Sequence, residues 1–389
     1  MGRLSCLDGS RGILALYVLL SHMAPFAWTP AAIQWLPKIF SHGGAAVDMF
    51  FILSGLVISG SLDSSAGQVR TFLMGRVTRT LPVFFVVFAA AVMLQPIATD
   101  FTAMPWVGPA SHPREIWSDG WPDAWWAELL AHVTMTHGLF PNGVLPNAWV
   151  SYLGAAWSLS TEWQFYIAIA LLWRVLGRRR WALAWVFFSL AIAAIAWRLS
   201  APLDLHFSRA FLPNKAHYFA LGIASGMLTV SARSLEAGSP ESLNRALTTK
   251  VSSARGRHAR VIAYFASLLG TCCICCAEGR IDKMGAPLTW TFVLAVQFIP
   301  TARLARFPAS VLRSPPLLWL GAISYDLYLV NEPIQKALSI LLGRVVAGNG
   351  PLFDLIWIPG AILLPLWAAW GLHHGIERPA IAWGRARAL

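Results

Sequence analysis

Arg11 and His22 lie eleven residues apart in an apolar run near the start of the chain. Eleven residues of α-helix turn through about 1100°, close to three full turns, so both side chains share one helix face. They are separated along the helix by roughly 16 Å, about half the hydrocarbon core of a bilayer. Charged and titratable groups inside a bilayer cost several kcal/mol and usually mark a functional site. The alternative is that Arg11 reaches the lipid headgroups while His22 bonds a neighbouring helix.

An imidazole can take a proton from a hydroxyl near neutral pH, which makes His22 a candidate general base. A carboxylate could fix the tautomer of its ring, and Asp48 and Glu162 both lie within reach by predicted depth. Each could instead be a buried structural group bonded to backbone or tyrosine hydroxyls. An acyl transfer also needs a hydrogen-bond donor for its oxyanion. Three side chains could supply it, and the sequence does not rank them: Asn331, Tyr325 and Ser158.

The composition requires a membrane protein. The 389 residues are 57% hydrophobic and 12% charged, more apolar surface than a soluble domain can bury. Runs of about 20 apolar residues can span a bilayer. We predict an all-α polytopic protein with one membrane-embedded domain over residues 1–389 and about ten transmembrane helices. The predicted spans are 11–30, 44–62, 80–98, 157–175, 181–200, 215–231, 259–278, 286–303, 317–342 and 354–375.

The net charge of +12 is explained by topology rather than by nucleic-acid binding. With a cytoplasmic N-terminus and ten spans, 20 of the 30 Lys and Arg residues fall in cytoplasmic segments and eight on the opposite side. This excess is what the positive-inside rule predicts. Both termini are then cytoplasmic, and the predicted location of the protein is the inner membrane. The first span is predicted to be a retained anchor rather than a cleaved signal.

Two connections stand out between the predicted spans. Residues 99–156 form an outer loop whose apolar part, 124–140, is too short and polar for a span and favours an interfacial or re-entrant helix. Residues 232–258 are predicted to form a flexible cytoplasmic loop. We expect Glu377 and Arg378 to form a local exposed pair of little energetic weight. We expect no metal, because the CCICC cysteines lie in an apolar helix without a polar second shell.

Five motifs occur in order along the chain: LDGSRGILALYVLLSH, HGGAAVDMFFILSGLVIS, FLMGRVTRTLP, WSLSTEWQFY and LGAISYDLYLVNEPI. Together they resemble the acyltransferase-3 family of integral membrane O-acyltransferases, which modify bacterial surface sugars, exopolysaccharides, nodulation factors and some macrolides. The resemblance covers essentially the whole chain. Single motifs such as RxxR are weak, but the ordered set is specific.

The resemblance assigns roles to particular residues. Arg11 and His22 match the Arg-x10-His pair of the family, and Glu162 matches the glutamate of WSLxxE. Arg76 and Arg79 match RxxR at the cytoplasmic mouth, where guanidinium groups could bind the phosphates of acyl-CoA. An ordinary positive-inside anchor is the alternative for this pair.

The chain departs from the family pattern at one position. Asn331 stands where the family has a histidine, and an amide cannot exchange a proton near neutral pH. If the family histidine orients a partner by hydrogen bonding, Asn331 could still serve. If that histidine shuttles a proton, this chain must do so otherwise or is impaired.

The resemblance therefore implies a membrane enzyme that moves an acyl group, acetyl in the simplest case, from acyl-CoA to a carbohydrate hydroxyl of exopolysaccharide or lipopolysaccharide. Its partners would be the bilayer, the acceptor and proteins of polysaccharide synthesis. A small-molecule acceptor of the macrolide type is the alternative. A transporter that uses His22, Asp48 and Glu162 as a polar pathway is a third reading, and an inactive scaffold a fourth.

Overall fold

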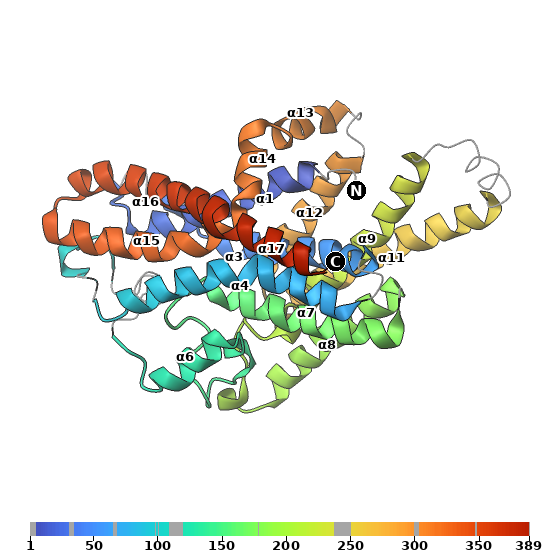
Figure 1. Ribbon diagram of the computed structural model, residues 1–389, viewed down its shortest axis with the longest axis horizontal. Helices are drawn as coiled ribbons and strands as arrows, with labels where there is room; N and C mark the ends of the chain where they lie inside the picture. The colour runs from blue at the N-terminus through green and yellow to red at the C-terminus, as the bar shows by residue number, and fades with distance from the viewer. Residues whose placement is uncertain are drawn as a thin grey trace.

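The computed structural model describes residues 5–30, 35–64, 68–97, 99, 101–108, 120–177, 179–236, 250–298, 303–346 and 348–388. All regular elements within these ranges are helices, arranged as one elongated bundle (Figure 1). The longer helices are α1 (Ser5–Met23), α3 (Gly43–Ser64), α4 (Val69–Leu94), α7 (Ala156–Leu176), α8 (Arg180–Ser200), α9 (Ala216–Glu236), α11 (Lys250–Ala277), α12 (Gly285–Phe298), α15 (Ser324–Val345) and α16 (Gly350–Leu372). The shorter ones are α2 (Leu36–Ile39), α6 (Trp125–Val133), α13 (Arg303–Leu312), α14 (Pro315–Ala322) and α17 (Arg378–Ala388).

Each predicted span overlaps a helix, but α1 ends at Met23 within the span 11–30, and the span 317–342 is divided between α14 and α15. The count of ten is not confirmed. By length and composition, five stretches of the described chain could cross a membrane by themselves. They are Pro37–Leu62, Val69–Leu94, Arg180–Ser200, His258–Ala277 and Gly350–Arg387. A sixth is possible if Ile281–Phe298 and Arg303–Leu312, bent by 95°, form one broken span.

One helix that fails this test is polar and lies in the interior of the bundle. Helix α15 carries Asp326, Asn331, Glu332, Gln335 and Lys336, and all five side chains are buried. By contrast, α8 and α16 expose many of their apolar side chains, as helices facing lipid do. Buried polar groups lower the hydropathy of α15, whereas α12, with 14 residues, is shorter than a span.

Glycines let the inner helices approach to backbone contact. At the crossing of α3 and α9, Gly55 faces Gly222. A Cβ on Gly222 would lie 2.0 Å from the carbonyl oxygen of Ile52, which no relaxation of a flexible side chain could relieve. Small residues at such crossings are typical of helix packing in membranes. This crossing fixes α3, which supplies residues to both cavities described below.

Both predicted connections contain helix in the structure. Within 124–140, α6 has nine residues, about 13 Å of helix, and is too short to cross a bilayer. The predicted loop 232–258 is helical at both ends, because α9 continues to Glu236 and α11 begins at Lys250. Residues 237–249 lie outside the described part of the chain.

Candidate active site

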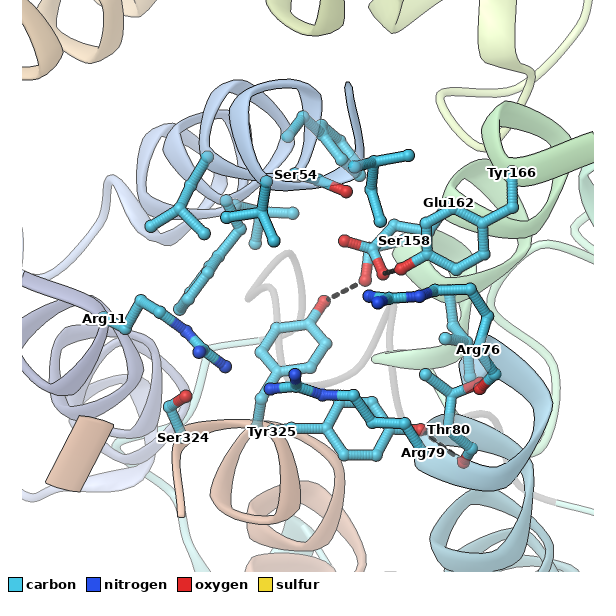
Figure 2. Close-up of a pocket in the computed structure, with 18 of the residues that line it drawn as sticks. Arg11, Ser54, Arg76, Arg79, Thr80, Ser158, Glu162, Tyr166, Ser324 and Tyr325 are labelled. Carbon is cyan, nitrogen blue, oxygen red and sulfur yellow. Dashed lines mark hydrogen bonds between the residues drawn. The ribbon is translucent and has the colours of Figure 1, made fainter. Parts of the chain in front are cut away.

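Three arginines converge on one cavity, named here the arginine cavity. Arg11 enters it from α1, and Arg76 and Arg79 enter from α4 (Figure 2). Their guanidinium groups point toward one another across the cavity. Glu162 from α7 is the one carboxylate among the described residues that line it. Three cations facing one carboxylate leave positive charge that suits a phosphate-bearing ligand.

Glu162 belongs to this arginine cavity and not to His22. The hydroxyl of Tyr166, one turn further along α7, donates a hydrogen bond of 2.8 Å to Glu162 Oε2. Arg76 donates to Ser61 Oγ at 3.3 Å and lies over the ring of Phe72, with 5.8 Å to its centroid. The expectation that Glu162 would support the His22 ring is not met, because a buried carboxylate is stabilised best by the cations around it.

His22 lies in a different cavity of about 380 Å³, named here the histidine cavity. Its wall includes two indoles, Trp149 and Trp157, and two charged side chains, Arg209 and Glu332. The His22 ring is held from α15: its Nδ1 lies 2.7 Å from Asn331 Oδ1. The amide nitrogen of Asn331 donates to the carbonyl oxygens of Leu327, at 3.0 Å, and Tyr328, at 2.6 Å.

These contacts determine the tautomer of neutral His22. Since the amide nitrogen of Asn331 is bonded to two carbonyls, its oxygen faces the ring and can only accept. Nδ1 of His22 must therefore carry the proton, and Nε2 is the basic nitrogen. An orienting acceptor behind a histidine is the arrangement found in acyl-transfer triads, including those with asparagine in third place.

Val47 and Tyr328 line both cavities and form the partition between them. Ser158 donates a hydrogen bond of 2.9 Å to the Tyr328 hydroxyl, which itself donates to the carbonyl of Ala155 at 3.2 Å. The two substrates of a transfer reaction could thus occupy separate cavities and meet across this partition.

None of the three predicted oxyanion donors has a hydrogen directed at the His22 ring. Tyr325 lies in the arginine cavity and donates to the carbonyl of Thr80 at 2.7 Å. The Ser158 hydroxyl donates to Tyr328, and both amide hydrogens of Asn331 go to the α15 backbone. Each of these groups makes a hydrogen bond within the fold, and the oxyanion role of all three stays a prediction.

Asp48 is also separate from His22. It is fully buried, and its Oδ1 lies 2.6 Å from Lys215 Nζ in η6 (Leu212–Lys215). Its Oδ2 lies 4.0 Å from Lys283 Nζ in η7 (Ile281–Met284). The expectation that Asp48 would hold the imidazole is not met, because these two buried lysines need a counter-charge. The sequence gives no periodicity that could link residues so far apart.

Glu377 was expected to pair with Arg378 at the surface, and this was wrong. It is 3% exposed and its Oε1 faces Arg79 Nε at 3.8 Å, behind the arginine cavity. Its Oε2 lies 2.5 Å from Nδ1 of His373, which is 3.5 Å from Asp326 Oδ2. The ligand atoms of Asp326, His373 and Glu377 lie within 4.8 Å of one another, a spacing that a metal ion could bridge. The short distance between His373 Nδ1 and Glu377 Oε2 is also that of a direct hydrogen bond between the two side chains.

A helical bundle with apolar outer helices, a polar interior and two adjoining cavities defines a membrane protein built for group transfer. Residues 4–374 match the family model described as an acyltransferase domain, so the chain belongs to the acyltransferase-3 family. It is a multi-pass membrane acyltransferase, as the ordered motifs predicted. No curated protein and no solved structure matches the chain.

Proposed function

We propose that the chain moves an acyl group, acetyl in the simplest case, from acyl-CoA to a hydroxyl of a carbohydrate such as exopolysaccharide or lipopolysaccharide. The proposed location is the inner membrane, with both termini and the arginine cavity on the cytoplasmic side. The observation that carries the proposal is the hydrogen bond of 2.7 Å between Asn331 Oδ1 and His22 Nδ1, because it leaves a basic Nε2.

The donor fits the arginine cavity. The guanidinium groups of Arg11, Arg76 and Arg79 would bind phosphate oxygens of acyl-CoA, and Glu162 would keep the arginines from repelling one another when the cavity holds no anion. The partition formed by Val47 and Tyr328 is where the thioester would meet the acceptor.

The acceptor fits the histidine cavity. Nε2 of His22 would take the proton of the acceptor hydroxyl as its oxygen attacks the thioester carbonyl carbon. The carbon–sulfur bond then breaks, and the imidazolium returns the proton to the leaving thiolate. Atoms and charge balance without a covalent enzyme intermediate. Asn331 keeps Nδ1 protonated throughout and steadies the imidazolium.

The test uses cells in which the gene for this chain is deleted and replaced by variants. We expect the O-acetyl content of surface polysaccharide to fall on deletion, to return with the wild type and to stay low with His22→Gln. His374→Gln is the matched control, since His374 is an exposed histidine at the end of the last long helix. Unchanged O-acetyl content in all strains would contradict a surface-polysaccharide acceptor.

A further inference from the structure

A third cavity of about 590 Å³, named here the side cavity, adjoins the histidine cavity. Five cations line it: Arg198, Arg209, Lys215, Arg280 and Lys283. Glu278 is the one carboxylate among its described lining residues. Arg209, Arg280 and Lys283 also line the histidine cavity, so this positive charge borders the space that contains His22.

The cations of the side cavity are not balanced by the buried carboxylate behind them. Lys215 is 4% exposed and Lys283 is 9% exposed, and a buried ammonium group is costly unless it has a counter-charge. Asp48 approaches both, at 2.6 Å and 4.0 Å, but one carboxylate neutralises only one ammonium group. A bound anion would supply the missing negative charge.

Arg209 lies on an aromatic wall between the two cavities. Its guanidinium carbon is 4.8 Å from the ring centroid of Trp149 and 5.9 Å from that of Trp157. Stacking of this kind orders a guanidinium group, and guanidinium groups bind carboxylate and phosphate oxygens in their plane. The wall therefore holds a cation in a fixed position at the border of the histidine cavity.

Two carboxylates also line the histidine cavity, and each has partners of its own. Asp282 lies 3.9 Å from Arg280 in an exposed pair, which is a weak interaction in water. The carboxylate of Glu332 accepts two backbone hydrogen bonds of 2.8 Å, from the amides of Gly154 and Ala155. Glu332 is thereby fixed to the backbone before α7.

We infer that the acceptor is an anionic sugar, whose carboxylate or phosphate binds Arg209, Arg280 and Lys283 while a hydroxyl of the same molecule reaches His22. An anionic acceptor in this role presupposes the proposed acyl transfer. The shared chemistry is an oxyanion on a sugar, either the carboxylate of a uronic acid or the diphosphate of a lipid-linked sugar.

Binding is measured with the purified chain in nanodiscs, by intrinsic tryptophan fluorescence. The probes are tetragalacturonate, its carboxyl-reduced neutral counterpart and inorganic diphosphate. We expect at least one anion to bind the wild type, and the neutral tetrasaccharide to bind at least tenfold more weakly. Each lost charge-assisted hydrogen bond is worth roughly 1.5–3 kcal/mol, so Arg209→Gln/Lys283→Gln should raise the Kd about tenfold or more.

Two controls locate the anion. Arg344→Gln removes another arginine of the predicted outer side, exposed and outside both cavities, and should leave Kd unchanged. Arg76→Gln/Arg79→Gln removes two of the three cations of the arginine cavity and should also leave Kd unchanged. If the double variant at the side cavity does not fold, Arg280→Gln replaces it, since that side chain is 44% exposed.

The outcomes separate the two anion sources and the two proposals. Binding of tetragalacturonate supports a uronic acid, and binding of diphosphate with no tetragalacturonate binding supports a lipid-linked sugar. Equal binding of the neutral tetrasaccharide, no binding of either anion, or loss of binding only in Arg76→Gln/Arg79→Gln would overturn the anionic acceptor. His22→Gln should still bind the anion, so a failure of the proposed acyl transfer leaves anion binding in place. A failure of anion binding in turn leaves the proposed acyl transfer in place.

Discussion

Replacing Asn331 by alanine should reduce the rate of acyl transfer while leaving donor binding intact. The change removes the oxygen that accepts from Nδ1 of His22 at 2.7 Å. Without it the ring can turn, and its proton can move to Nε2, which then cannot act as a base. The variant also frees the carbonyls of Leu327 and Tyr328, which now accept from the amide.

The size of the effect follows from the hydrogen bond that is lost. A buried group that loses its partner costs about 1–3 kcal/mol. At about 1.4 kcal/mol for each factor of ten, kcat should fall roughly 5- to 150-fold. The KM for acyl-CoA should stay within about twofold, because its proposed phosphate ligands lie in the other cavity.

The assay measures thiol release from acetyl-CoA by the chain in nanodiscs, with and without acceptor. Asn331→His restores the residue type of the family and should keep most of the activity, since a ring nitrogen can also accept. Gln335→Ala is the matched control: this residue lies on the same helix, is fully buried, and its amide nitrogen donates to the carbonyls of Leu19 and Ala361. Wild-type kcat in Asn331→Ala, or an equal loss in Gln335→Ala, would refute the orienting role.

Three further predictions concern the donor, pH and the fold. Arg76→Gln should raise the KM for acetyl-CoA about 10- to 100-fold, whereas Arg70→Gln, an exposed arginine at the start of the same helix, should leave it unchanged in steady-state kinetics. Burial lowers the pKa of His137 to about 4 in the folded outer segment. The unfolded imidazole titrates near 6.5, so the burial of neutral His137 contributes fully to the free energy of unfolding only above that pH. This contribution falls by about 3 kcal/mol as the pH decreases toward 4. Thermal unfolding between pH 7.5 and 4.5 would show this, and His137→Gln should flatten the dependence. Gly222→Val should prevent α3 and α9 from meeting and abolish the folded monodisperse species on size-exclusion chromatography, while Gly75→Val in open space should not.

Much of the arginine cavity could be anticipated from the sequence. Arg76 and Arg79 occur three residues apart, so they share one helix face, and Arg11 lies at the same predicted depth. The position of Glu162 beside them was not anticipated, because this carboxylate was a candidate to support the His22 ring. Local periodicity carries this information because each element presents its own side chains at fixed angles.

The partners of the buried carboxylates and of His22 could not be anticipated in the same way. Asp48 and Lys215 are 167 residues apart, and His22 and Asn331 are 309 apart. Such pairs depend on which helices pack together. The role of Asn331 also depends on two backbone carbonyls that direct its amide, a detail that side-chain type alone does not encode. The sequence left open whether Asn331 orients a partner by hydrogen bonding or impairs the chain, and in the structure its oxygen faces the His22 ring.

The partition formed by Val47 and Tyr328 has an electrical consequence. In the proposed orientation, the arginine and histidine cavities open toward opposite faces of an energised membrane and approach each other at these two side chains. If water fills both, much of the transmembrane voltage would drop across this partition, at about 2.3 kcal/mol per elementary charge for each 100 mV. The neutral acyl group would cross this field without electrical work, whereas the proton that His22 returns to the thiolate carries one elementary charge across it. Each acyl transfer to the outer side would therefore be coupled to the inward movement of one proton.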